Sequence, residues 1–206
     1  MIGLAFTTTE AAAPFLKQYR QGRLRELSEG EHTYDDDVLV TITGVGKIKA
    51  TLRTERLLQE FALDRLIHPG TCTALTDELD AGTLVGITHV LEGDRIQLSA
   101  PSYPRMPLDQ PFEAPAEGTL VTHDHGIGNQ DERSYWQRIA DLSDATGYAI
   151  AYVAAQHGVP CSILMVPTGR VLEENEDFRQ QLHDARETVA AFLIEQIESG
   201  VLTDDD

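Results

Sequence analysis

Short apolar runs alternate with amphipathic stretches along this chain, and the alternation predicts an α/β fold with a mixed or largely parallel sheet. Continuous apolar runs rich in β-branched residues are typical of strands buried inside such a sheet. Strands are predicted in these runs: 1–7, 38–43, 64–70 (ending at His68-Pro69-Gly70), 82–94, 118–122 and 160–169. The segment 95–118 holds five of the nine prolines, which predicts an extended loop or edge segments there.

The amphipathic stretches predict helices between these strands. Helices are predicted over 8–21 (capped by Thr8 or Thr9), over 47–63, from about Asp131 or Ser143 to Gln156, and over 175–199. The last one has apolar residues every three or four positions, which predicts a buried stripe at Phe178, Leu182, Ala185, Val189, Leu193 and Ile197. The stretch SDATGYAIAYVAAQHGVP (143–160) is rich in small residues and is suited to close packing, with Asp144 able to cap its N-terminus.

The length, charge and cysteine content of the chain limit the classes of protein to which it can belong. The chain has 206 residues, which suits one domain, and we expect the acidic tail 199–206 to fray. It carries 34 acidic against 16 basic residues, a formal charge of −18, which argues against binding to nucleic acid or to anionic membranes. The sequence has no apolar run long enough to span a bilayer and no basic secretion signal. Its two cysteines lie outside any CxxC pattern, which favours reduced thiols. A cytoplasmic location is therefore expected.

Four glycine-containing loops follow predicted strands: 44–47, 68–75, 122–129 and 167–170. Ligands bind past the carboxyl ends of strands in open α/β sheets, so these four loops together predict a shared crevice, although any one of them alone is more simply interpreted as a turn. His123 and His125 fall on one face of a strand, but no HExxH or CxxC motif supports a metal site. Cys72 near His68 lacks an acidic partner for a thiol nucleophile, and Gly44-Val45-Gly46 does not continue into a dinucleotide fingerprint, so no cofactor is expected.

The order and spacing of several segments resemble the nucleoside phosphorylase and nucleosidase superfamily. The segments are TTEAAAPFL, TGVGKIKA, HPGTCTALTDELDAGTLV, LVTHDHGI and DATGYAIAYVAAQHGVPCSILMVPTG, and the likeness spans about residues 2–195. The chain looks most similar to the hydrolytic branch, the methylthioadenosine/S-adenosylhomocysteine nucleosidases and futalosine hydrolases. The resemblance implies a three-layer α/β/α fold around a mixed, partly barrel-like sheet, cleavage of the bond between ribose and a base, and a homodimer.

The resemblance also implies a set of site residues. Glu10 falls where the hydrolases carry the acid that positions water, and Gly44 and Gly46 match the glycine turn of the family. Gly70 and Thr71 match the small-residue loop beside the ribose or phosphate, and His68 stands where phosphorylases carry an arginine.

A second group of positions falls on the base side. Thr122 and Asp124 match the Ser-Gly-Asp turn of the family. Gly126 replaces the usual stacking aromatic residue, while His125 and the backbone of Ile127 are expected to contact the base.

Two positions depart from the family pattern. The glutamate that holds the ribose is replaced by Thr146, and Asp144 is the nearest carboxylate. The Ser-Asp or Ser-Asn pair after the last strand is replaced by Thr168-Gly169, and a threonine hydroxyl is a very poor general acid at neutral pH.

Three functions therefore remain open. The first is hydrolysis of the N-glycosidic bond of a purine-type nucleoside, with Glu10 and Asp124 or Asp144 as catalytic groups. The second is a degenerate family member that binds a nucleoside-like ligand without turnover. The third is phosphorolysis, which needs a cationic phosphate site that Lys47 and Arg170 would have to supply.

Overall fold

The computed structural model describes residues 1–94, 104–172 and 177–202. The helices within these ranges are α1 (Thr9–Gln18), the 3-10 turn η1 (Tyr19–Gln21), α2 (Lys47–Glu60), α3 (Gln130–Trp136), α4 (Gly147–His157) and α5 (Phe178–Glu198). The strands are β1 (Ile2–Phe6), β2 (His32–Tyr34), β3 (Val38–Ile42), β4 (Arg65–Ala74), β5 (Val85–Glu92), β6 (Met106–Pro107), β7 (Ala116–Thr122), β8 (Leu142–Asp144) and β9 (Cys161–Arg170).

The described strands form one mixed sheet, part of which closes on itself. The order is β2-β3-β1-β4-β8-β7-β5-β6, and β9 pairs with both β4 and β5. Strands β4, β9, β5, β7 and β8 therefore form a closed ring, with antiparallel pairing at β9–β5 and β8–β4 and parallel pairing elsewhere. This arrangement confirms the predicted mixed, partly barrel-like sheet.

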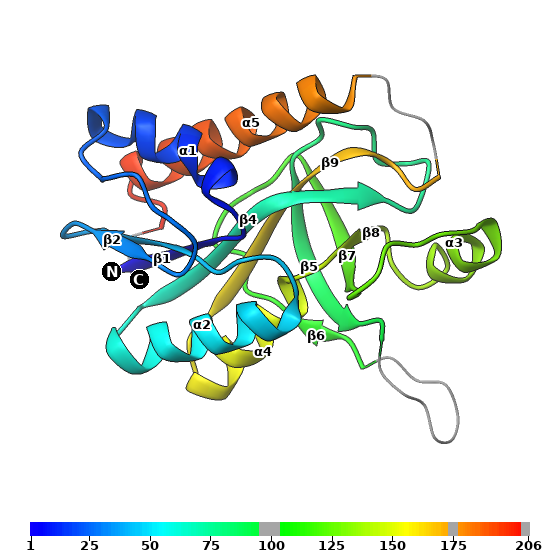
Figure 1. Cartoon of the computed structure of the whole chain (residues 1–206), viewed down its shortest axis with the longest axis horizontal. Coiled ribbons are helices and arrows are strands. Elements are labelled where there is room, and N and C mark those ends of the chain that lie inside the picture. The colour runs from blue at the N-terminus through cyan, green and yellow to red at the C-terminus, as the bar shows by residue number, and fades with distance from the viewer. Residues whose placement is uncertain (95–103, 173–176, 203–206) are drawn as a thin grey trace.

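Helices cover the sheet in two pairs (Figure 1). Helices α1 and α5 pack together on one face, and α2 and α4 pack together on the other. The predicted three-layer α/β/α architecture is therefore confirmed. Helix α3 lies apart from these layers, beyond the end of the ring.

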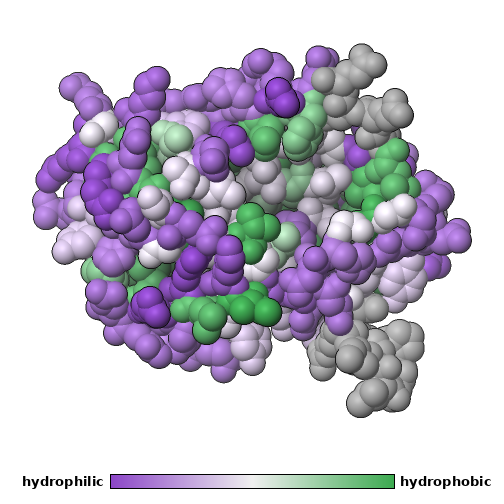
Figure 2. All heavy atoms as spheres, viewed as in Figure 1, coloured by the Kyte–Doolittle hydropathy of each residue, from purple (hydrophilic) through white to green (hydrophobic). Residues whose placement is uncertain are grey.

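Hydrophilic side chains cover most of the face shown in Figure 2. A hydrophobic patch interrupts them over α2, where Ile48 is 76% and Leu52 65% exposed. Val45, just before α2, is 56% exposed. Isolated exposed apolar residues are common, but neighbouring ones on one helix face indicate a surface that a partner can cover.

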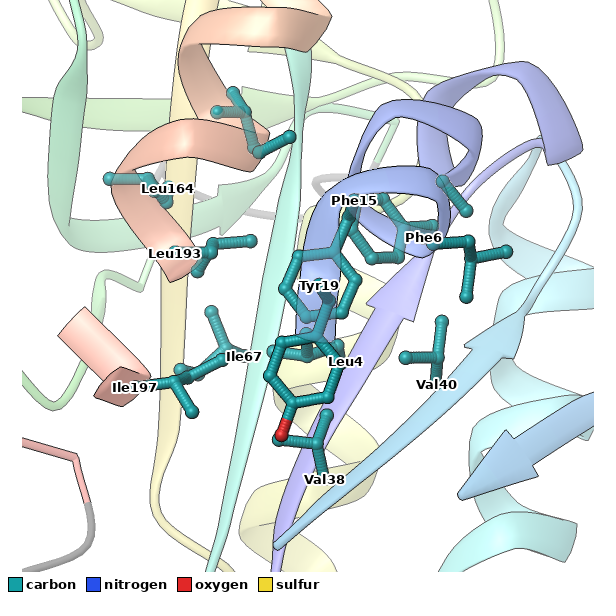
Figure 3. Close-up of a cluster of buried hydrophobic side chains, with 14 of the residues drawn as sticks. Leu4, Phe6, Phe15, Tyr19, Val38, Val40, Ile67, Leu164, Leu193 and Ile197 are labelled. Atoms are coloured by element: carbon teal, nitrogen blue, oxygen red, sulfur yellow. The ribbon is translucent and has the colours of Figure 1, made fainter. Parts of the chain in front are cut away.

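The largest buried cluster fills the layer between the sheet and the α1–α5 pair (Figure 3). Phe15 and Tyr19 stack at 5.0 Å between ring centroids, and Leu193 and Ile197 of α5 reach the same cluster. The stripe predicted for α5 is confirmed at Ala185, Val189, Leu193 and Ile197. Leu202 also lies in this cluster, while residues 203–206 of the expected frayed tail lie outside the described residues.

Three local predictions were wrong, two at the ends of elements and one about a helix. Strand β4 does not end at Gly70 but runs to Ala74. Pro69 is tolerated inside β4 because it lies beyond the three residues of β4 that pair with β1. At Pro69 the strand pairs on one side, with β9, so the missing N–H does not interrupt pairing with β1. Phe178 is 47% exposed, because it is the first residue of α5 and lies at the end of the stripe.

The helix predicted from Asp131 or Ser143 to Gln156 is in fact three elements. Helix α3 ends at Trp136, Ser143 and Asp144 belong to the short strand β8, and α4 begins at Gly147. A Cβ atom at Gly147 would lie 2.7 Å from Leu120, so the small residue allows α4 to start directly against β7. The proline-rich prediction is confirmed at β6, a two-residue strand at the edge of the sheet, whereas 95–103 lie outside the described residues.

Candidate active site

A crevice made of two adjoining cavities lies where the C-terminal parts of β4, β7, β8 and β9 meet. The cavities share Thr71, Asp144 and Ala145. The larger cavity is about 350 Å³ in volume. It is lined by Thr71, Cys72, Thr73, His123, Asp124, His125, Gly126, Ile127, Ser143, Asp144, Ala145, Thr168, Val171, Phe178 and Leu182. The smaller cavity is about 180 Å³ and is lined by Thr7, Thr8, Ala11, Val45, His68, Gly70, Thr71, Asp144, Ala145, Thr146 and Arg186.

The Asp144 carboxylate lies at the junction of the two cavities, and its side chain is only 4% exposed. Its Oδ2 accepts hydrogen bonds from the backbone N–H of Thr146 at 3.0 Å and of Gly147 at 2.7 Å, so it binds the start of α4, although the N-cap residue is Thr146. Its Oδ1 accepts the hydroxyl of Thr122 at 2.6 Å. Burial acts to raise the pKa of this carboxyl, but interaction with His68 and these hydrogen bonds outweigh burial and lower it. Asp144 is therefore a buried negative charge.

His68 is fully buried beside this carboxylate. Its Nδ1 donates to the carbonyl of Ala5 at 2.7 Å, which fixes the orientation of the ring. Its Nε2 lies 3.2 Å from the hydroxyl of Thr146 and 3.9 Å from Oδ2 of Asp144. Both ring nitrogens are engaged within the protein, so His68 supports Asp144 and Thr146 from beneath the smaller cavity.

Asp124 lies at the mouth of the larger cavity and is held by Lys47. Lys47 Nζ is 3.3 Å from Asp124, 2.8 Å from Asp94 and 3.1 Å from Glu92, with its own side chain 13% exposed. Burial lowers the pKa of this ammonium, but the hydrogen bonds and charges of Asp94 and Glu92 raise it overall. Lys47 therefore joins the start of α2 to the loop that follows β7.

Two histidines flank Asp124. The rings of His123 and His125 lie 5.4 Å apart between centroids, but both residues follow the end of β7 and so do not share a strand face as predicted. His125 Nε2 is 2.8 Å from Glu132 and Nδ1 is 3.2 Å from Asp94, and these carboxylates, Glu132 first, raise the pKa of His125. Burial lowers the pKa of His123. No cluster of three potential metal ligands occurs among the residues that the structure describes.

The crevice brings most of the predicted site residues together. Those that line it are His68, Gly70, Thr71, Asp124, His125, Ile127, Asp144, Thr146 and Thr168. Gly44 and Gly46 flank the lining residue Val45 without lining the crevice themselves. Glu10 also lies outside the lining, exposed in the first turn of α1 between the lining residues Thr8 and Ala11.

The cation that lines the smaller cavity was not predicted from the sequence. Lys47 is bound by three carboxylates, and Arg170 by Asp77 and Asp80, and neither lines the crevice. Arg186 of α5 does line it, with a buried Nε that has no hydrogen-bond partner. A signal was present in the sequence, because Arg186 follows Leu182 by four residues and adjoins Ala185 on the apolar side of α5.

None of the helices within the described ranges is long and apolar enough to cross a membrane. Both cysteines are free and buried, as expected from their placement in the sequence.

Comparison with known proteins agrees with this fold. The chain is 21% identical to an aminodeoxyfutalosine nucleosidase of Helicobacter pylori over 189 residues, 78% of this chain and 80% of that protein. Its fold is similar to the crystal structure of the Helicobacter pylori 5'-methylthioadenosine/S-adenosylhomocysteine nucleosidase, with a TM-score of 0.81 at 19% identity, covering 96% of this chain and 97% of that one.

A third similarity is to the corresponding nucleosidase of Colwellia psychrerythraea, solved in complex with adenine. The TM-score is 0.80 at 16% identity, over 96% of this chain and 94% of that one. The family model for the phosphorylase superfamily matches residues 5–198, so the chain belongs to that superfamily.

Proposed function

We propose that this protein hydrolyses the N-glycosidic bond of a purine-type nucleoside bound in the crevice. The observation that carries the proposal is the Asp144 carboxylate, a buried charge at the junction of two cavities of unequal size. Cleavage of such a bond gives the ribose oxocarbenium character, and a fixed negative charge next to the ribose stabilises that positive charge in the transition state.

The larger cavity suits the base and the smaller one the ribose side and the attacking water. Asp124, His125, Ile127 and Thr168 would contact the base, whereas His68, Gly70, Thr71 and Thr146 would lie along the ribose. Glu10, at the rim beside Thr8, would position the water. Hydrogen bonds with its own backbone and with Thr8 lower the pKa of Glu10 and favour the ionised form that this role needs.

The relatives support the same reaction class. Proteins named as nucleosidases share this fold over most of their length, and one of them was solved with adenine. The test is to offer the purified protein methylthioadenosine, adenosine, inosine and futalosine, and to measure free base. Base released without added phosphate supports hydrolysis, and no release from any nucleoside counts against it.

Binding without turnover is the second candidate, and two positions favour it. Thr146 and Gly169 stand where the family carries its ribose-binding glutamate and its base-activating acid. A nucleoside that raises the thermal unfolding midpoint of the protein without releasing base would identify a binder. Measurable turnover would exclude this candidate.

Phosphorolysis is the third candidate, and Arg186 is the observation that favours it. It is the one lysine or arginine among the described residues that line the crevice, and its Nε has no partner. A phosphorylase would release base only when phosphate is present and would form ribose 1-phosphate. Release that is independent of phosphate would exclude it.

We further propose a homodimer formed through α2, in the cytoplasm. The exposed side chains of Val45, Ile48 and Leu52 support the dimer, because together they present an apolar surface that a second copy would cover. Val45 also lines the smaller cavity, so such an interface would lie next to the crevice. Two free thiols support a reducing compartment.

A further inference from the structure

The surroundings of the larger cavity are strongly anionic. Neither lysine nor arginine is among its described lining residues, whereas Asp124 and Asp144 both are. Glu92, Asp94 and Glu132 lie directly behind this lining, in contact with Lys47 or His125. Four of these carboxylates thus lie around one ammonium and one imidazole, and Asp144 adds a fifth beside His68. The larger cavity therefore has a negative potential that favours a cation.

The described lining also offers no unpaired acid to protonate a departing base, because the Asp124 carboxylate lies 3.3 Å from the Lys47 ammonium. Position 169 is a glycine with φ of 150°, a backbone conformation that residues with side chains rarely adopt. The neighbouring hydroxyl of Thr168 donates to the carbonyl of Cys72 at 3.4 Å. Asp144 already accepts four hydrogen bonds, and the surrounding donors stabilise its ionised form.

The two histidines of the lining do not supply the proton that a departing base would need. Both nitrogens of His125 face carboxylates, Asp94 on one side and Glu132 on the other, so both are already engaged within the protein. His123 is 1% exposed, and its Nε2 is buried without a hydrogen-bond partner. Burial lowers the pKa of His123 and so favours its neutral form, and a neutral imidazole is a poor acid.

Resting on the proposed nucleosidase function but widening its base beyond purines, we propose that the substrate is a nucleoside whose base already carries a positive charge, such as an N-alkylated purine or a pyridinium riboside. Water attacks the anomeric carbon, and the C–N bond breaks with its electron pair going to the ring nitrogen. That pair neutralises the cationic ring, so the leaving group takes up no proton. The attacking water loses one proton to solvent, and each turnover yields the free sugar, a neutral base and one released proton.

An aromatic side chain in the lining fits the same ligand. Phe178 lines the larger cavity at the start of α5. Aromatic faces attract cations held within about 6 Å of the ring centroid. A neutral base in this cavity would require a proton that the described lining does not provide, whereas a cationic base would gain from both the carboxylates and the ring.

The test compares matched cationic and neutral nucleosides at pH 6 without phosphate. The pairs are 7-methylguanosine with guanosine, and nicotinamide riboside with its uncharged dihydro form. General acid catalysis contributes about 10²–10⁴-fold, so we expect kcat/KM for the cationic member to be at least about 100-fold higher, with one proton released per base. Equal or faster cleavage of the neutral members would overturn the inference and leave the nucleosidase proposal standing. No cleavage of any of these four, nor of methylthioadenosine, adenosine, inosine or futalosine, would reject the nucleosidase proposal itself.

A variant separates the charge of the cavity from the intrinsic reactivity of cationic nucleosides. Asp124→Asn removes one negative charge at the mouth of the cavity, and Asp184→Asn removes one from the exposed surface of α5. We expect Asp124→Asn to reduce the preference for the cationic member several-fold, mainly through KM, and Asp184→Asn to leave it unchanged. An unchanged preference in Asp124→Asn would contradict the electrostatic basis of the inference.

Discussion

The hydroxyl of Thr122 at the end of β7 donates a hydrogen bond to the Asp144 carboxylate at the end of β8 across 2.6 Å. The same hydroxyl accepts the backbone N–H of Tyr148 in α4 at 2.9 Å. Thr122 is fully buried, so one side chain links two strands of the ring to the helix that begins beneath the crevice. This link keeps the charge of Asp144 in place.

Replacing Thr122 with valine should therefore destabilise the protein, because it leaves a buried carboxylate oxygen and a buried N–H without their partner. We expect a loss of about 1–3 kcal/mol in the free energy of unfolding, measured by urea denaturation. Thr188→Val is the matched control, since Thr188 is exposed on α5 and bonds only its own helix. A loss in Thr122→Val no larger than in the control would contradict this account.

The lowered pKa of Asp144 predicts how stability depends on pH. A carboxyl whose pKa is lower in the folded state than in the unfolded state stabilises the folded state at pH values above its ordinary pKa of about 3.9. This stabilisation is lost as the pH falls through the lower pKa of the folded state. Asp144→Asn should be less stable than the native protein at pH 7, and the difference should shrink as pH is lowered towards 3. A difference that stays constant with pH would show that the charge of Asp144 contributes nothing.

Lys47 should stabilise the fold more than a typical surface lysine. Lys47→Met leaves three neighbouring carboxylates to repel one another. We expect the substitution to lower the free energy of unfolding by about 1–2 kcal/mol, a value reduced because the carboxylates are partly exposed to solvent. The control is Lys49→Met, because Lys49 is 54% exposed and pairs with one carboxylate, Glu29, among the described residues. The cost in Lys47→Met should fall at high salt, which screens the repulsion. Equal effects of the two substitutions would refute a special role for Lys47.

How far the sequence predicts this structure depends on the length of each element. Strand β9 and helix α5 are long enough for their patterns to be read directly, and both form where predicted. Strand β8 has three residues, too few for any periodicity, and the helix-favouring sequence after it concealed the boundary at Asp144. Its pairing with β4 and β7 depends on residues far apart in the chain.

The candidate site was predictable to a similar degree. Asp124 follows β7, and Thr71 lies in the C-terminal part of β4. Their approach at one edge of the sheet could be expected from the sequence, because both positions come late in or after a strand. The charged partners of these residues could not be predicted, because Lys47 and Asp124 lie in contact although they are 77 positions apart in the sequence. Arg186 reaches the crevice from α5, and the stripe pattern alone does not indicate what its side chain faces.

The apolar surface on α2 predicts the oligomeric state. Ile48→Glu places a charge in the middle of the proposed dimer interface and should convert a dimer to a monomer in sedimentation or light-scattering measurements. Val201→Glu changes another exposed apolar residue, 48% exposed and outside α2, and should leave the dimer intact. A native protein that is monomeric, or an Ile48→Glu variant that stays dimeric, would refute an interface on α2.

Release of free base from nucleosides by the native protein and by Asp144→Asn tests the central claim most directly. The assay should include both neutral and cationic nucleosides, because the identity of the base is a separate question. We predict phosphate-independent release by the native protein, reduced at least about 100-fold in a folded Asp144→Asn variant, because that substitution removes the charge that stabilises the ribose cation. Absence of base release from every nucleoside, or equal release by the two proteins, would contradict the account.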